Sequence, residues 1–103
     1  MISQSFRDEL VNTIVPLVNP LKIVLFGSYA YGTPNQDSDL DLVVILQNVS
    51  SKHKEATKLY KLLKNIRYPK DILVSSIDEY EFYKNEPGSV YKTIHDKGVI
   101  LYG

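Results

Sequence analysis

The strongest constraint on the fold is a pair of short apolar runs joined by a short polar loop. Residues 21–26 (LKIVLF) and 39–46 (DLDLVVIL) are rich in β-forming side chains, which predicts two buried strands. Between them, residues 27–38 hold two glycines, a proline and several small polar residues. This composition predicts a loop, with one helical turn near residues 28–31. Because a parallel crossover needs a longer connection, usually a helix, we expect the two strands to pair antiparallel.

The remainder of the chain supplies helices that can cover these strands. Apolar residues recur at helical spacing over residues 2–18, which predicts an amphipathic helix whose last turn is disturbed by Pro16. The other expected elements are a helix at 51–67, a strand at 70–75, short helices at 78–84 and 88–96, and a weak strand at 99–102. This order predicts an α/β (α+β) fold, in which helices flank a small mixed β-sheet. With 103 residues, the chain is expected to form a single domain over residues 1–103.

Composition excludes several classes of function. Twelve Lys and Arg balance twelve Asp and Glu, so the net charge indicates neither a nucleic acid nor a membrane surface as partner. The absence of cysteine excludes disulfides, thiolate metal sites and cysteine catalysis, and it suits a reducing cytoplasm. No apolar run approaches the roughly 20 residues that span a bilayer. The N-terminus has no apolar signal-peptide core, so we expect a cytoplasmic protein.

Three aspartates are the candidate chemical groups. Asp39 and Asp41 lie two positions apart at the start of a predicted strand, so both carboxylates project from one face. Two adjacent carboxylates repel each other, and oxygen ligands of this kind suit Mg²⁺ or Mn²⁺. Asp71 begins the next predicted strand and would join the pair if the two strands are neighbours. Taken alone, the D-x-D pair and Asp71 are each better explained as solvated surface acids, because such residues are common.

The loop before the acidic pair has the composition of a phosphate-binding turn. Gly27 and Ser28 follow the first strand directly, and glycine allows a sharp turn and a close approach to a ligand. A serine hydroxyl and backbone N–H groups at a helix start can hold a phosphate. Gly32 permits a second tight turn, and Ser38 can cap or brace the entry to the acidic strand. Alone, the same residues would describe a plain turn with a serine cap.

Together these motifs resemble a known signature. Residues 27–32 (GSYAYG) followed by residues 38–42 (SDLDL) resemble the minimal nucleotidyltransferases of the DNA polymerase β-like superfamily, whose pattern is a Gly-Ser loop, a second glycine and Ser-Asp-x-Asp-Leu. The specific match covers residues 26–46, and the order of elements resembles the family over nearly the whole chain. Many members carry arginine at the position of Tyr31, which offers only a hydroxyl to a phosphate.

The resemblance implies a polymerase β-like nucleotidyltransferase fold and a specific reaction. A nucleoside monophosphate, expected to be AMP from ATP, is transferred to a hydroxyl and pyrophosphate is released. Gly27, Ser28 and Ser38 would bind the nucleotide, and Asp39, Asp41 and Asp71 would bind Mg²⁺ or Mn²⁺, with Asp71 helping to deprotonate the acceptor. In the minimal family the companion is a small helical HEPN protein, often in a toxin–antitoxin pair whose nucleotidyltransferase is the antitoxin.

Two alternatives remain open at this stage. The first is a non-catalytic antitoxin or regulatory subunit that binds nucleotide but acts by partner contact alone. The second is RNA binding through the basic segment 52–70, in which six Lys and one Arg face a single acid. A solvated helix face explains that charge bias more simply. His53 and His95 lie in polar surroundings and are read as surface residues.

Overall fold

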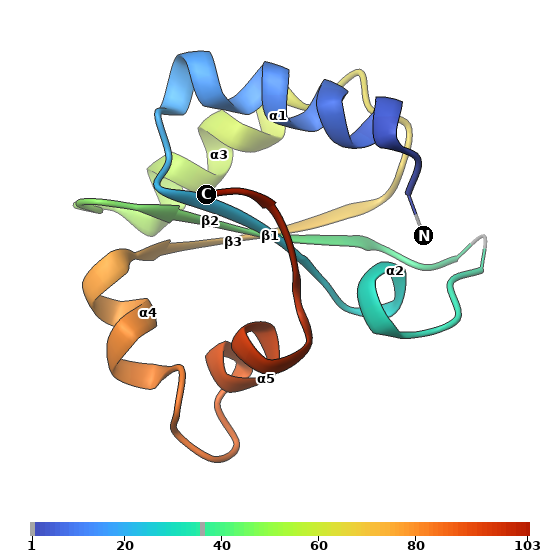
Figure 1. Cartoon of the computed structure of the whole chain (residues 1–103). Coiled ribbons are helices and arrows are strands. Elements are labelled where there is room, and N and C mark those ends of the chain that lie inside the picture. Colours follow the sequence, from blue (N-terminus) through green and yellow to red (C-terminus); the bar gives the residue numbers. More distant parts are fainter. Residues whose placement is uncertain (1, 36) are drawn as a thin grey trace.

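A four-stranded mixed sheet in the order β3-β2-β1-β4 forms the middle layer of the protein (Figure 1). The structure, a computed structural model, describes residues 2–35 and 37–103. Its elements are α1 (Gln4–Val18), β1 (Lys22–Phe26), α2 (Ser28–Tyr31), β2 (Leu40–Leu46), α3 (Lys52–Leu62), β3 (Lys70–Ser76), α4 (Ile77–Tyr83), α5 (Val90–Lys97) and β4 (Val99–Tyr102). Helices α1 and α3 cover one face of the sheet, and α4 and α5 cover the other (Figure 1). The predicted α/β (α+β) class, with helices flanking a small mixed sheet, is confirmed.

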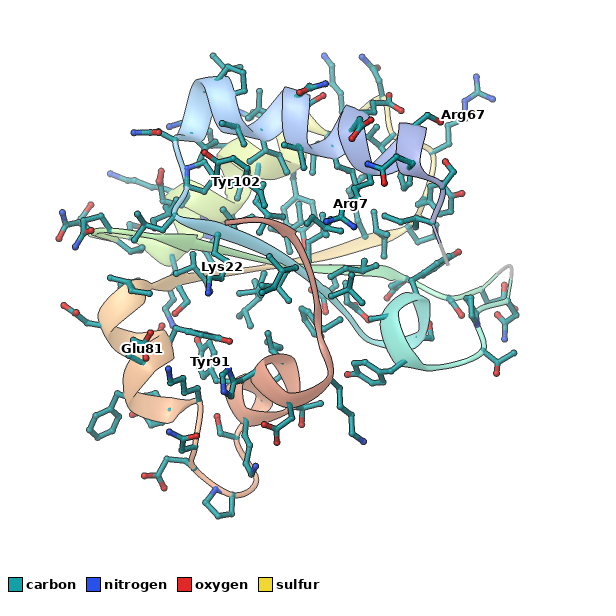
Figure 2. All side chains as sticks on the ribbon, viewed as in Figure 1. Arg7, Lys22, Arg67, Glu81, Tyr91 and Tyr102 are labelled. Carbon is teal, nitrogen blue, oxygen red and sulfur yellow. The ribbon has the colours of Figure 1, made fainter. Side chains whose placement is uncertain are left out.

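Strand pairing follows the sequence argument. β1 and β2 are antiparallel, as the short linker predicts, with Phe26 opposite Asp41. β2 and β3 are parallel neighbours, because α3 supplies the long crossover between them. β4 returns antiparallel to β1 and completes the sheet on that side. The guanidinium of Arg7 on α1 donates a hydrogen bond to the carbonyl of Ile100 on this edge strand (2.8 Å; Figure 2).

The sheet separates two apolar clusters. In β2, Leu42 and Val44 belong to the larger cluster, which also contains Leu10 of α1. Val43 and Ile45 alternate with them and belong to the smaller cluster beneath α4 and α5. Every residue from Leu42 to Ile45 is fully buried, which explains why this strand reads as a continuous apolar run. The acidic start of β2 therefore emerges from the best-buried strand of the fold.

Serine hydroxyls begin the four long helices. Ser3, Ser51, Ser76 and Ser89 precede α1, α3, α4 and α5, and each side chain accepts a backbone N–H from the first turn. Such caps satisfy N–H groups that have no partner within the helix. Among the described residues, no helix is both long and apolar enough to cross a membrane.

The end of α1 agrees with the sequence prediction, whereas the end of α3 does not. α1 continues through Pro16 to Val18, the predicted last residue, and its C-cap is Asn19, whose φ of 52° is left-handed and whose N–H donates to the carbonyl of Val15. An exposed proline near a helix end forfeits one backbone bond, which here does not stop the helix. α3 was expected to reach residue 67 but ends at Leu62. A turn follows, in which Ile66 donates its N–H to the carbonyl of Leu63 while both side chains remain buried. The core contacts survive without the last helical turn.

Candidate active site

The sheet brings two of the three candidate aspartates side by side. Asp41 of β2 and Asp71 of β3 are direct partners in the parallel register. The expected adjacency of Asp71 is thereby confirmed. Asp39 lies one residue before β2 and is exposed, as is Asp71, whereas Asp41 is half-buried. All three carboxylates therefore lie at one end of the β2–β3 pair.

Strand alternation places this acidic end on the face covered by α4 and α5. Asp41 shares its side of β2 with Val43 and Ile45, which pack in the smaller cluster. Phe26, opposite Asp41, and Leu73, two positions after Asp71, are partly buried against the same cluster. The acids thus stand beside an apolar surface that could support an uncharged part of a ligand.

Gly27 approaches the Asp41 carboxylate more closely than any other residue type could. Its φ of 75° is left-handed, and a Cβ placed there would overlap Oδ2 of Asp41 and lie 2.9 Å from its Cγ. Only glycine tolerates both the backbone angle and the contact. The turn from β1 into α2 is therefore pressed directly against the half-buried acid.

The predicted helical turn over 28–31 is confirmed as α2. The N–H groups of Ala30 and Tyr31 donate to the carbonyl of Gly27, and Gly32 donates to the carbonyl of Ser28. A Cβ on Gly32 would lie 2.9 Å from Cα of Ser28, so the second glycine lets the loop fold back closely on the first. The Gly-Ser turn and its return are thus fixed by backbone contacts.

Ser38 braces the loop that delivers Asp39. Its hydroxyl oxygen accepts the N–H of Asn35 at 3.0 Å. After the loop, the N–H of Leu40 donates to the carbonyl of Pro69 at 2.7 Å, which ties the start of β2 to the segment before β3. Asp39 is held between these two anchored residues.

Electrostatics single out Asp41 among the three acids. Burial raises the pKa of the Asp41 carboxyl, and the charges of Asp71 and Asp39 raise it further. Removing the negative charge, or compensating it with a cation, relieves both the burial cost and the repulsion. Asp41 is thus affected both by Asp39, from the same segment, and by Asp71, from the neighbouring strand.

The donor set fits a Mg²⁺ or Mn²⁺ ion that is shared with a ligand. Within residues 2–35 and 37–103, no three His, Cys, Asp or Glu side chains are arranged to hold a metal ion by themselves. Mg²⁺ in phosphate-transfer sites is commonly held by one or two carboxylates, waters and substrate phosphates, not by a complete protein cage. Asp41, with Asp39 or Asp71, matches that requirement in ligand type.

One polar cluster was missed at the opposite end of the β2–β3 pair. Glu79 of α4 accepts hydrogen bonds from Lys52 (2.7 Å), Tyr91 (3.1 Å) and the buried Ser75 (3.2 Å). Burial alone would raise the pKa of Glu79, but these three donors lower it on balance. Tyr91 lies between the sheet and the α4–α5 layer (Figure 2). Because the partners come from α3, β3 and α5, sequence spacing carried no signal of this cluster.

The basic helix α3 lies on the sheet face opposite the acids. A shallow groove of about 410 Å³ runs along α3, lined by Lys54, Thr57, Lys58, Lys61 and Leu62. α3 packs on the larger cluster, so this groove is on the sheet face opposite the carboxylates. Lys52 pairs with Glu79, Lys58 with Glu55, and Lys70 donates to the carbonyl of Ile66. The groove has no acid to bind a metal, so the chemistry is better placed at Asp41.

Comparison with known families decides the class of the protein. The pattern of the nucleotidyltransferase domain family matches residues 7–101. The chain belongs to this family. The predictions of a nucleotidyltransferase enzyme and of a polymerase β-like nucleotidyltransferase fold are both confirmed.

Relatives of this nucleotidyltransferase include two proteins of Methanocaldococcus jannaschii that carry the provisional name of protein adenylyltransferase. MJ0141 is 34% identical over 73 residues, covering 60% of this chain and 73% of the relative. MJ1305 is 36% identical over 58 residues, covering 56% of this chain and 33% of the relative.

A solved structure shares the fold of this nucleotidyltransferase. It is the crystal structure of the toxin–antitoxin MntA–HpeT, in a mutant with two aspartates changed to glutamate. It matches with a TM-score of 0.57 at 17% identity, over 94% of this chain and 73% of the other. The likeness is one of backbone arrangement.

Proposed function

We propose that this nucleotidyltransferase transfers AMP from ATP to a hydroxyl group of a partner protein, with the help of a divalent cation. The observation that carries the proposal is the packing of Gly27 against the Asp41 carboxylate, with Asp71 as its register partner. This geometry sets the Gly-Ser turn directly beside the acids. The similarity to two proteins named as adenylyltransferases supports a protein acceptor.

In the proposed reaction the acceptor oxygen forms a bond to the α-phosphorus, and the bond from that phosphorus to the bridging oxygen of the β-phosphate breaks. Pyrophosphate leaves with the electron pair. The proton of the acceptor hydroxyl passes to Asp71, whose exposed carboxylate is open to an incoming side chain. A cation, when bound, offsets the charge that develops on the phosphate oxygens. Asp39 and Asp41 would hold it, and the charge of Asp41 would be relieved most because both Asp71 and Asp39 repel it.

The Gly-Ser turn positions the triphosphate. The backbone of Gly27 packs against the Asp41 carboxylate, and Ser28 offers its hydroxyl to a phosphate at the start of α2. Ser38 belongs to the same binding surface through the loop that it braces. Phe26 and Leu73 supply the apolar surface for the nucleoside.

We further propose that the acceptor is a small helical protein of the HEPN type and that the pair forms a toxin–antitoxin system. Support comes from the resemblance of residues 26–46 to the minimal nucleotidyltransferases and from the fold shared with the toxin–antitoxin MntA–HpeT. The mutant form of that structure changes two aspartates two positions apart, the spacing of Asp39 and Asp41 in this chain.

The test measures transfer of radioactive label from ATP to a helical partner protein that is co-expressed with this chain. Purified wild-type protein, the Asp39→Asn/Asp41→Asn double variant and the control Glu86→Gln, which replaces an exposed acid outside the site, are each incubated with Mg²⁺ and ATP labelled at the α- or the γ-phosphate. We expect label from the α-phosphate alone, with wild type and control but not with the double variant. If wild type labels no protein and the double variant still suppresses the toxicity of the partner, the non-catalytic antitoxin would be established instead.

A further inference from the structure

A cation from α5 lies beside the Gly-Ser turn. Lys97 is the last residue of α5, and its ammonium lies 5.8 Å from the centre of the Tyr31 ring. Tyr31 ends α2, the short helix that the turn begins. An ammonium at this distance from an aromatic face is attracted to the ring, so the contact favours one position of a flexible side chain.

The pairing of β4 with β1 brings the C-terminal end of α5 close to the end of β1. Val99, the first residue of β4, pairs antiparallel with Leu25 of β1. Lys97 precedes Val99 by two positions, and Gly27 follows Leu25 by two positions. β1 lies between β2 and β4 in the sheet, so the segment that leads from α5 into β4 and the acidic strand β2 flank β1 on opposite sides.

Gly98 fixes this close approach. A Cβ on Gly98 would overlap the carbonyl oxygen of Ile94 and lie 2.6 Å from Cγ1 of Val24. The N–H of Gly98 also donates to that same carbonyl at 2.8 Å. The end of α5 therefore packs directly against β1, which keeps the backbone of Lys97 close to the Gly-Ser turn.

Lys97 is also available for a ligand. Among residues 2–35 and 37–103, no carboxylate lies within ion-pair distance of its ammonium. On the same face of the sheet, Lys84 pairs with Glu81 and Lys92 pairs with Asp96. Lys97 thus stands out as the unpaired ammonium beside the turn.

We propose that Lys97 binds the polyphosphate of the nucleoside triphosphate and that the Tyr31 ring holds the lysine in position. The inference rests on the proposed function, because it assigns one more contact to the same substrate. Across the sheet the groups then follow the order Asp71, Asp41, Gly27, Lys97. The acids hold the cation, the turn approaches the phosphates, and Lys97 neutralises the end of the polyphosphate that lies farthest from the acids.

Binding measurements separate this contact from a general effect of charge. Titration calorimetry with Mg²⁺–ATP and with AMP is carried out on wild type, Lys97→Met, Lys97→Arg and the control Lys61→Met. Lys61 is an exposed lysine on the opposite sheet face, so its loss changes the net charge equally. We expect Lys97→Met to weaken ATP binding on the order of tenfold, while AMP binding stays within about twofold and Lys97→Arg retains most of the affinity.

The role of Tyr31 is tested in the same assay. Tyr31→Phe keeps the aromatic face and is expected to bind ATP as wild type does, whereas Tyr31→Ala is expected to lose roughly two- to fivefold. ATP affinities that are the same for Lys97→Met and Lys61→Met would overturn the assignment of Lys97 alone. Wild-type protein that binds no nucleoside triphosphate at all would refute the proposed function, and the Lys97 assignment with it.

Discussion

Replacing Asp41 by asparagine is expected to stabilise the fold while it abolishes nucleotidyl transfer. Asp41 is half-buried beside Asp71 and near Asp39, and these surroundings raise the pKa of its carboxyl. At neutral pH its ionised form therefore costs the native state free energy that the unfolded chain does not carry. Asparagine has nearly the same shape and no charge.

The size of the effect follows from the strand geometry. Carboxylates on neighbouring strands are about 5 Å apart, where two charges repel by roughly 1 kcal/mol in water and roughly 3 kcal/mol at an effective dielectric of 20. Because Asp71 is exposed and Asp41 only partly buried, solvent screening favours the lower figure. We expect Asp41→Asn to raise the free energy of unfolding by about 1 kcal/mol, and Tm by roughly 4–8 °C.

The pH dependence gives a sharper signature. Asp41 has a raised native pKa, so the native state holds its proton over a range in which the unfolded state has lost it. Wild-type stability therefore falls, relative to the variant, as pH rises from the ordinary carboxyl pKa of 3.8 through the native value. Below that range both proteins carry a neutral group and the difference closes.

The assay is chemical denaturation of wild type, Asp41→Asn and the control Glu86→Gln between pH 3 and pH 8, without added metal. Glu86 is an exposed acid after α4, so its loss changes the net charge without touching the site. A repeat with Mg²⁺ and ATP should stabilise wild type and leave Asp41→Asn unchanged, since only wild type retains the ligand. The reasoning would be refuted if Asp41→Asn were no more stable than wild type at pH 7 while the control Glu86→Gln had wild-type stability.

Three further outcomes follow from contacts elsewhere in the fold. Gly27→Ala should lose activity and at least roughly 2 kcal/mol of stability, because its Cβ meets the Asp41 carboxylate. The control Gly88→Ala has a similar φ of 84° but open space around its Cβ, and it should cost only about 1 kcal/mol in the same denaturation assay. Glu79→Gln should lower the free energy of unfolding by roughly 1–2 kcal/mol near pH 7, a modest loss because solvent screens its half-exposed lysine partner. The stability difference from wild type should vanish as pH falls through the lowered pKa of Glu79, where the wild-type carboxylate also loses its charge. Gly98→Ala should displace the end of α5, lowering Tm and ATP affinity together; unchanged ATP affinity in calorimetry would contradict the seating of that helix.

Much of the acidic end could be predicted because it depends on local rules. The D-x-D spacing fixed a common face for Asp39 and Asp41, and the short loop fixed the antiparallel pairing of β1 and β2. The neighbouring position of Asp71 needed one additional assumption, that β3 follows β2 in the sheet, which a helical crossover commonly satisfies. Each step used chain connectivity alone.

The contacts that were not predicted depend on how distant segments pack. Lys97 meets Tyr31 because β4 reverses along β1 and because Gly98 allows α5 to lie close to it. The partners of Glu79 come from three other elements, and no periodicity in the sequence connects them. The early end of α3 reflects a tertiary requirement, since a turn after Leu62 still buries the apolar side chains that follow.

The division of the core by the sheet has a consequence for how the protein opens. The larger apolar cluster lies under α1 and α3, whereas the acids stand at the rim of the smaller cluster under α4 and α5. Layers with fewer buried contacts exchange their amide hydrogens through local opening at lower free energy than the global transition. We therefore expect the amide hydrogens of α4 and α5 to exchange before those of β2. The backbone hydrogen bonds of β2 are expected to break only on complete unfolding. The face that carries the candidate acids is therefore expected to open locally while the opposite face keeps the domain folded.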